Sequence, residues 1–167
     1  MHKLLKIFLL IVVLLCSFLA GQVITKHFYT RQKFYSSLCT FCENLNLKIS
    51  YSKSKLEDIV KSQMERESGE FVKLLGKYLA FIKNEESKEE FMNYKIRFLS
   101  NSERELVLDF FASLGEMAKE EEIEKISYHK KAFDKTSEEC TESTKKFSSL
   151  YFKLCMVFGL FLVVIFI

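Results

Sequence analysis

The two ends of the chain constrain its fold most, because both are too apolar to be left in water. The 14 residues from Leu154 to Ile167 contain no charged side chain, and a second apolar run extends from Ile7 to Ala20. A helix of about 14 residues rises only ~21 Å, whereas the hydrocarbon core of a bilayer is ~30 Å thick. Adding Tyr151 and Phe152, with Lys153 reaching to the interface, gives a short span. We predict membrane anchors over residues 1–25 and 151–167.

Each anchor has an alternative interpretation. A basic start followed by an apolar run and the small residues near Ser17 is typical of a cleaved signal peptide. Phe18 and Leu19 interrupt the cleavage pattern, and Leu15 does not suit a lipoprotein box at Cys16. The second run could instead be a buried core helix, although its place at the end of the chain disfavours this. We therefore favour two uncleaved anchors.

The middle of the chain, residues 26–150, has the composition of a soluble helical body. The whole sequence has no proline and five glycines, so the residues that mark tight turns are scarce. Acidic and basic residues number 22 and 25 and are intermixed, which gives a net charge of +3. This pattern lacks the basic face of a nucleic-acid-binding protein. We predict an all-α fold, a bundle of about five to six helices flanked by two terminal transmembrane helices.

Basic residues flank the anchors mainly on the side of the body. These are Lys26, Arg31 and Lys33 after the first anchor, and Lys145, Lys146 and Lys153 around the start of the second. Only Lys3 and Lys6 lie on the other side. Because Lys and Arg accumulate on the cytoplasmic side of membrane helices, the body is predicted to face the cytoplasm in a two-pass protein of the cell membrane.

Apolar spacing and capping signals divide the body into helices. One stripe continues the first anchor to about residue 50, and further helices are expected near 56–68, 70–83, 88–98 and 102–114. Three serines stand three residues before a glutamate, as in capping boxes: Ser54, Ser87 and Ser102. The brief helix after Ser87 is expected to carry Tyr94, Ile96 and Phe98. Gly115 is a natural left-handed end for the helix before it.

A long helix is predicted from about Glu116 into the second anchor. Its apolar seam is thin, with polar residues at alternate heptad-like places. The seam consists of Ile123, Ile126, Phe133, Cys140, Phe147 and Tyr151. We expect this helix to lie beside the first long helix, since both leave the same membrane.

With these elements laid out, the chain resembles the stage III sporulation protein AB family of endospore-forming bacteria. The resemblance rests on Glu105–Gly115 (ELVLDFFASLG), on Tyr151–Leu160 (YFKLCMVFGL) and on Leu45–Tyr51 (LNLKISY). It spans nearly the whole chain, including the two-anchor layout.

The resemblance implies a non-enzymatic role in the channel complex between mother cell and forespore. The family's helical body is similar to the inner-membrane platform protein of type II secretion systems. The implied location is the mother-cell side of the outer forespore membrane. The implied partners are the secretion-type ATPase called stage III sporulation protein AA and other sporulation channel proteins. Whether the chain also forms a homo-oligomer is left open by the sequence.

Two sets of residues are candidates for contacts. The charge run Lys119–Glu122 with Glu124 and Lys125 is most often only a solvated face. On the family interpretation, the acidic turn with Gly115, Glu116, Lys119, Glu120 and Glu122 is our candidate for docking the ATPase. Gly21 and Gly159 are candidates for close packing of the two anchors.

Cys39 and Cys42 form the one local motif with possible chemistry. A redox C-x-x-C needs a thiolate at a helix start, whereas this pair lies within a helix, and a zinc site needs four ligands. His129 and Cys140 could complete such a site only by coincidence. We therefore predict no catalytic residue, cofactor or metal. A generic doubly anchored helical adaptor is the first alternative, and a membrane thiol oxidoreductase using Cys39 and Cys42 is the second.

Overall fold

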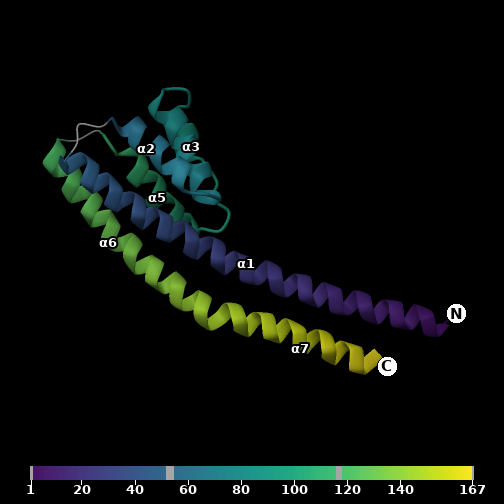
Figure 1. Ribbon diagram of the computed structural model, residues 1–167. Helices are drawn as coiled ribbons and strands as arrows, with labels where there is room; N and C mark the ends of the chain where they lie inside the picture. The colour runs from purple at the N-terminus through teal and green to yellow at the C-terminus, as the bar shows by residue number, and fades with distance from the viewer. Residues whose placement is uncertain (1, 52–54, 116–117, 167) are drawn as a thin grey trace. The chain divides into compact units, whose positions relative to one another are not determined.

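The computed structural model describes residues 2–51, 55–115 and 118–166, and every regular element within these ranges is helical. The predicted all-α fold is therefore confirmed. In chain order the elements are α1 (His2–Tyr51), α2 (Leu56–Arg66), α3 (Glu70–Ile82), α4 (Lys88–Met92), α5 (Asn101–Ala112), α6 (Lys119–Ser143), the π-helix η1 (Thr144–Ser148) and α7 (Ser149–Phe166) (Figure 1).

Contacts divide the chain into two compact units. One consists of Met1–Gln32 with Glu139–Ile167, and the other of Lys33–Glu138. The single 50-residue helix α1 contributes to both, as predicted from the stripe that continues the first apolar run. The boundaries between the two units, after Gln32 and after Glu138, lie nearer the middle of the chain than residues 25 and 150, the expected limits of the helical body.

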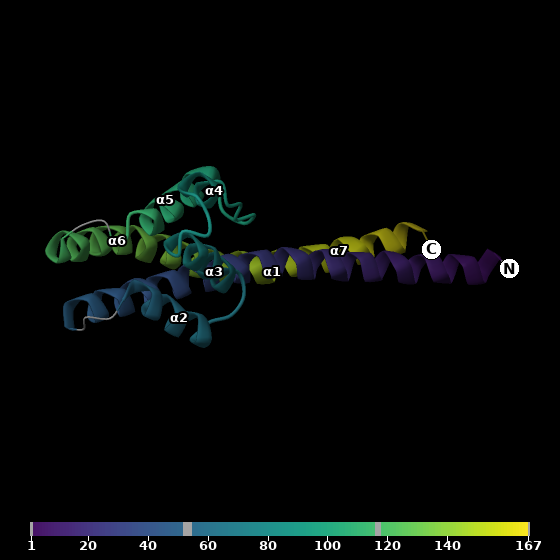
Figure 2. The same cartoon turned by 90° about the horizontal axis from the view of Figure 1, so that it is seen from above.

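The first unit pairs the start of α1 with the end of α6, η1 and α7 (Figures 1 and 2). Three hydrogen bonds join α1 to the segment formed by α6 and η1. Gln32 Nε2 donates to Thr141 Oγ1 over 3.3 Å, Thr144 Oγ1 to the Phe28 carbonyl over 3.4 Å, and Thr25 Oγ1 to the Ser148 carbonyl over 3.4 Å. Along these three bonds the residue numbers on α1 fall while those of the bonded residues rise, so the two helices are antiparallel. The predicted pairing of the two long helices is confirmed.

The second unit is built around aromatic rings. The Phe111 ring on α5 lies 4.9 Å from that of Tyr78, 5.4 Å from Phe41 and 6.5 Å from Phe71, measured between centroids. Phe110 continues the cluster to Phe133 on α6 at 5.4 Å. All six side chains are at most 1% exposed. One aromatic core therefore joins α1, α3, α5 and α6.

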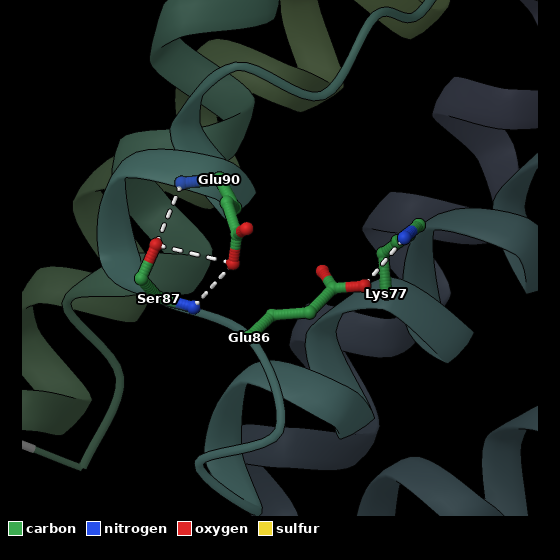
Figure 3. Close-up of polar contacts among 4 residues, drawn as sticks. All are labelled: Lys77, Glu86, Ser87 and Glu90. Atoms are coloured by element: carbon green, nitrogen blue, oxygen red, sulfur yellow. Dashed lines mark hydrogen bonds and ion pairs between the residues drawn. The ribbon is translucent and has the colours of Figure 1, made fainter.

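Two of the expected helix starts form as capping boxes, one of them at a different serine. Ser87 and Glu90 bond reciprocally at the start of α4, where Lys77 also pairs with Glu86 (Figure 3). The second box uses Ser100 and Glu103, so the prediction of Ser102 was wrong. Ser100 has extended backbone angles and Asn101 already begins the helix, which places Ser102 inside the first turn.

Two further expectations concern the short helices. Ser54 lies outside the described residues, and the N-cap of α2 is Lys55, which forms no side-chain capping bond. The helix predicted through Phe98 ends at Met92, so Tyr94, Ile96 and Phe98 do not lie on it. Ile96 is instead 7% exposed in the segment after α4, and the Phe98 ring lies 5.1 Å from that of Phe34. Tertiary packing, not helix formation, buries these side chains.

The seam of the last long helix changes at the π-helical turn. Ile126, Phe133 and Cys140 are buried as predicted, but Phe147 and Tyr151 are each 41% exposed. Thr144 and Ser148 are buried in their stead. The wider turn of η1 shifts the register of the helix, because its hydrogen bonds span one more residue than those of an α-helix. A heptad extrapolated through this turn therefore follows the wrong face.

Candidate functional site

The turn between α5 and α6 is fixed by Gly115. Helix α5 ends at Ala112, three residues before the glycine. Gly115 has φ +85°, in the left-handed region that was predicted for it, but the C-cap of α5 is Ser113, so the prediction that the helix stops at Gly115 was wrong. Its N–H donates to Glu122 Oε1 over 2.8 Å. Glu122 therefore holds the turn closed instead of presenting its whole carboxylate to a partner.

An acidic surface follows on α6, which we define as the acidic face: Glu120, Glu121, Glu124 and Tyr128. All four side chains are exposed, Tyr128 to 71%. A shallow hollow of about 380 Å³ lies here, lined by Glu121, Glu124, Lys125, Tyr128 and His129. The ion pairs of the described residues include neither Glu121 nor Glu124. The acidic face thus combines un-neutralised carboxylates with one exposed aromatic ring.

His129 forms the floor of this hollow. It is 6% exposed, and its ring lies 5.3 Å from that of Phe110 and 6.0 Å from that of Phe133. Burial lowers the pKa of His129, Lys125 lowers it further, and Asp109 opposes the shift. Within the described part of the chain, Nδ1 has no hydrogen-bond partner. The side chain is thus a neutral core residue under the acidic face.

The structure gathers most of the predicted partner-binding residues at this end of α6. Gly115, Lys119, Glu120 and Glu122 lie at or beside the α5–α6 turn, whereas Glu116 lies outside the described residues. The charge run predicted from the sequence included Glu121 and Glu124, but sequence reasoning did not group Tyr128 with these two glutamates. Their spacing of three and four residues, which places them on one helix face, was the signal available.

The two anchor glycines lie where the paired helices approach each other. A Cβ added to Gly159 would stand 2.5 Å from Ser17 Oγ and 2.7 Å from Ser17 Cβ. A Cβ on Gly21 would stand 2.9 Å from Phe152 Cδ2. Neither position has room for a larger side chain without a shift. Whether these contacts hold the anchors together in a bilayer stays a prediction.

Cys39 and Cys42 lie within α1, where the surroundings disfavour a thiolate. Burial raises the pKa of Cys39 to about 12, and a hydrogen bond to Asp134 adds to the shift. Burial also raises the pKa of Cys42, which is 0% exposed. Reactive cysteines need the opposite, a lowered pKa with access to solvent. In the described ranges, no group of three or more His, Cys, Asp or Glu side chains could hold a metal ion.

Among the residues that the structure describes, two helices are long and apolar enough to cross a membrane. They run through Ile11–Ile49 and Lys119–Val164, and the most apolar 18-residue stretch of each is 6% and 11% buried. A soluble core helix of this length would be mostly buried. These stretches therefore support a membrane protein with an apolar segment near each end, as the sequence predicted.

Comparison with protein families gives one match over almost the full length. The family described as stage III sporulation protein AB matches residues 6–167. No curated protein and no solved structure matches the chain.

Proposed function

The chain belongs to the stage III sporulation protein AB family, and from this premise we propose that it is a membrane platform of the sporulation channel complex. Family membership supports a role in sporulation. Our proposal adds that the helical body docks a cytosolic secretion-type ATPase, stage III sporulation protein AA. It also places the protein on the mother-cell side of the outer forespore membrane.

The acidic face is the observation that carries the docking proposal. Glu121 and Glu124 are exposed carboxylates outside any ion pair of the described residues, and Tyr128 beside them is 71% exposed. Charge complementarity steers association and selects partners, and exposed tyrosine is enriched at binding surfaces. The surface on the ATPase that meets this face should therefore be basic.

The support beneath the acidic face suits a docking surface that must keep its shape. Phe110, His129 and Phe133 pack under it with ring centroids 5.3–6.0 Å apart. On the α1 side of α6, Lys130 pairs with Glu43 at 3.1 Å and with Asp134 at 2.7 Å. A rigid base of this kind lowers the entropy cost of binding, because fewer groups are ordered on contact.

The anchors supply the platform's attachment. In this proposal residues 7–24 and 151–166 cross the bilayer, and the basic residues beside them keep the body in the cytosol. Helix α1 carries an anchor and core residues such as Phe41 in one uninterrupted helix. The role is mechanical: the body seats the motor, and the two helices fix its seat to the membrane.

Copurification with the ATPase tests the docking surface. The full chain, solubilised in mild detergent, is used to capture stage III sporulation protein AA, and a Glu121→Lys/Glu124→Lys variant is compared with it. The matched control is Glu138→Lys/Glu139→Lys, which reverses two exposed charges further along the same helical run. We expect at least a tenfold loss for the first variant and little change for the control. Equal capture by all three proteins would remove the acidic face from the proposal.

Gene deletion in the host tests the sporulation role independently. We expect a block after engulfment with normal vegetative growth, scored as loss of heat-resistant spores. A block without ATPase capture would leave a doubly anchored adaptor with another partner. A Cys39→Ser/Cys42→Ser strain should sporulate normally, because the raised pKa of both thiols does not suit redox chemistry.

A further inference from the structure

A groove lies between α1 and the start of α7 within the first unit, at the level where the proposed anchors meet the body. We define this interface groove by its lining: Leu19, Gln22, Val23, Thr25, Lys26, Tyr29, Ser148, Ser149 and Phe152. Its volume is about 750 Å³. None of the lining residues belongs to the acidic face.

The lining changes from apolar to polar along the groove. Leu19, Val23 and Phe152 form the end that lies toward the middle of the anchors, whereas Lys26 and Tyr29 form the end nearer the body. The rise from Leu19 to Lys26 is ~10 Å. Each headgroup layer of a bilayer is ~5–8 Å thick beyond a hydrocarbon core of ~30 Å. The groove thus crosses from hydrocarbon to headgroup depth over its own length.

The π-helical turn shapes one wall of the groove. Ser148 closes η1, is 6% exposed, and accepts a hydrogen bond at its carbonyl from Thr25 Oγ1. Thr144 Oγ1, at the other end of the turn, shares its one hydrogen between the carbonyls of Cys140 at 2.8 Å and Phe28 at 3.4 Å. The turn is therefore tied to α1 at both ends. Single π-turns occur often at functional sites, because they displace one wall of a helix.

The charge at the polar end is positive. Lys26 lines the groove, no carboxylate of the described residues does, and Lys145 and Lys146 lie within a few residues of its second wall. Glu142, the nearby carboxylate, pairs with Lys146 at 3.4 Å. A ligand must therefore carry negative charge at one end and hydrocarbon at the other.

We propose that the interface groove binds one anionic phospholipid. The phosphate lies at Lys26 and Tyr29, with the hydroxyl of Ser149 below it, and one acyl chain follows Leu19, Val23 and Phe152. The proposal rests on the membrane attachment put forward above, but not on ATPase docking. An apolar helix of a partner would leave Lys26 uncompensated, so the charge of the groove favours a lipid.

Native mass spectrometry of the full chain in mild detergent tests this proposal. Phosphatidylglycerol and phosphatidylcholine are titrated separately, and binding of the first lipid is measured. Lys26→Gln removes the groove charge, and its matched control Lys153→Gln removes one basic charge outside the lining. Ser149→Trp fills the groove, and its control Leu150→Trp adds the same bulk at a position that is 54% exposed and outside the lining.

The wild type should bind one phosphatidylglycerol at least fivefold tighter than phosphatidylcholine. Lys26→Gln should lose about fivefold in phosphatidylglycerol affinity, the size of one basic residue's attraction to an anionic surface, and Ser149→Trp should lose the tight site. Both controls should bind as the wild type does. Equal loss in the Lys26 and Lys153 variants would mean unspecific attraction and overturn the proposal.

Two other outcomes would also overturn it. The wild type could show no preference for the anionic lipid, or Ser149→Trp could break a dimer instead of releasing lipid, in which case a second copy fills the groove. Flotation of the same protein with phosphatidylglycerol–phosphatidylcholine vesicles distinguishes either of these outcomes from a failure of the membrane proposal. A chain that floats but selects no lipid loses the groove proposal alone.

Discussion

Truncation of Phe111 to alanine should remove the centre of the aromatic core. Phe111 is 0% exposed, and its ring meets those of Tyr78, Phe110, Phe41 and Phe71 at centroid distances of 4.9, 5.3, 5.4 and 6.5 Å. These neighbours come from α1, α3 and α5. The cavity left by Phe111→Ala is therefore walled by three helices, which can collapse onto it only by moving relative to one another.

The cost of this change is large compared with the stability of a domain. A buried Phe→Ala substitution costs about 3–5 kcal/mol, because lost transfer free energy adds to the cavity. Domains of ordinary size have an unfolding free energy of about 5–15 kcal/mol. With a urea dependence of about 2 kcal/mol/M, the midpoint of unfolding should fall by about 1.5–2.5 M.

The assay is urea unfolding of the full chain in mild detergent. The near-ultraviolet circular dichroism of its tyrosines is the signal that reports unfolding. Leu106→Ala on the same helix is the control, since this side chain is 39% exposed and its loss should cost below about 1 kcal/mol. Phe111→Leu should restore part of the loss by refilling the cavity. If Phe111→Ala moved the midpoint no further than Leu106→Ala does, the aromatic cluster would not be the core of this unit.

Three further outcomes follow from the structure. Ser100→Ala should cost about 1 kcal/mol in urea unfolding through loss of the α5 cap, whereas Ser102→Ala should cost almost nothing. Because burial lowers the pKa of His129, the unfolded chain takes up the proton first below about pH 6.5, so stability falls as the pH falls. His129→Phe should reduce the loss of stability between about pH 7 and pH 5.5, by up to about 1.4 kcal/mol, and an unchanged pH profile would contradict the neutral, buried state. Gly159→Ala should lower the thermal aggregation temperature of the full chain in detergent, because the new Cβ meets Ser17, and a second change, Ser17→Gly, should restore it.

The helical elements with local signals could be predicted from the sequence. The Ser87 capping box, the left-handed Gly115 and the apolar run that opens α1 each depend on residues within a few positions of one another. The pairing of the two long helices also followed from the sequence, since two apolar ends require one common apolar environment. Family membership followed in the same way, because the pattern extends over residues 6–167.

Other features depend on contacts between distant residues. Ser100 and Ser102 both precede a glutamate by three positions, and only the path of the chain after Ile96 decides which serine caps α5. The register shift at η1 depends on how the helix packs against Phe28 and Thr25 across the first unit.

The residues of the candidate sites could be predicted from the sequence only in part, for the same reason. Sequence reasoning found the acidic turn but not Tyr128 above a buried His129, because burial on α6 is set by rings contributed from α5. Gly21 and Gly159 could be proposed as close-packing residues, but the groove beside them is formed by side chains more than a hundred positions apart. Local chemistry determined that these segments form helices and where some of them begin, whereas packing between distant segments decided the remaining ends, which helical faces are buried and which remain available for partners or lipid.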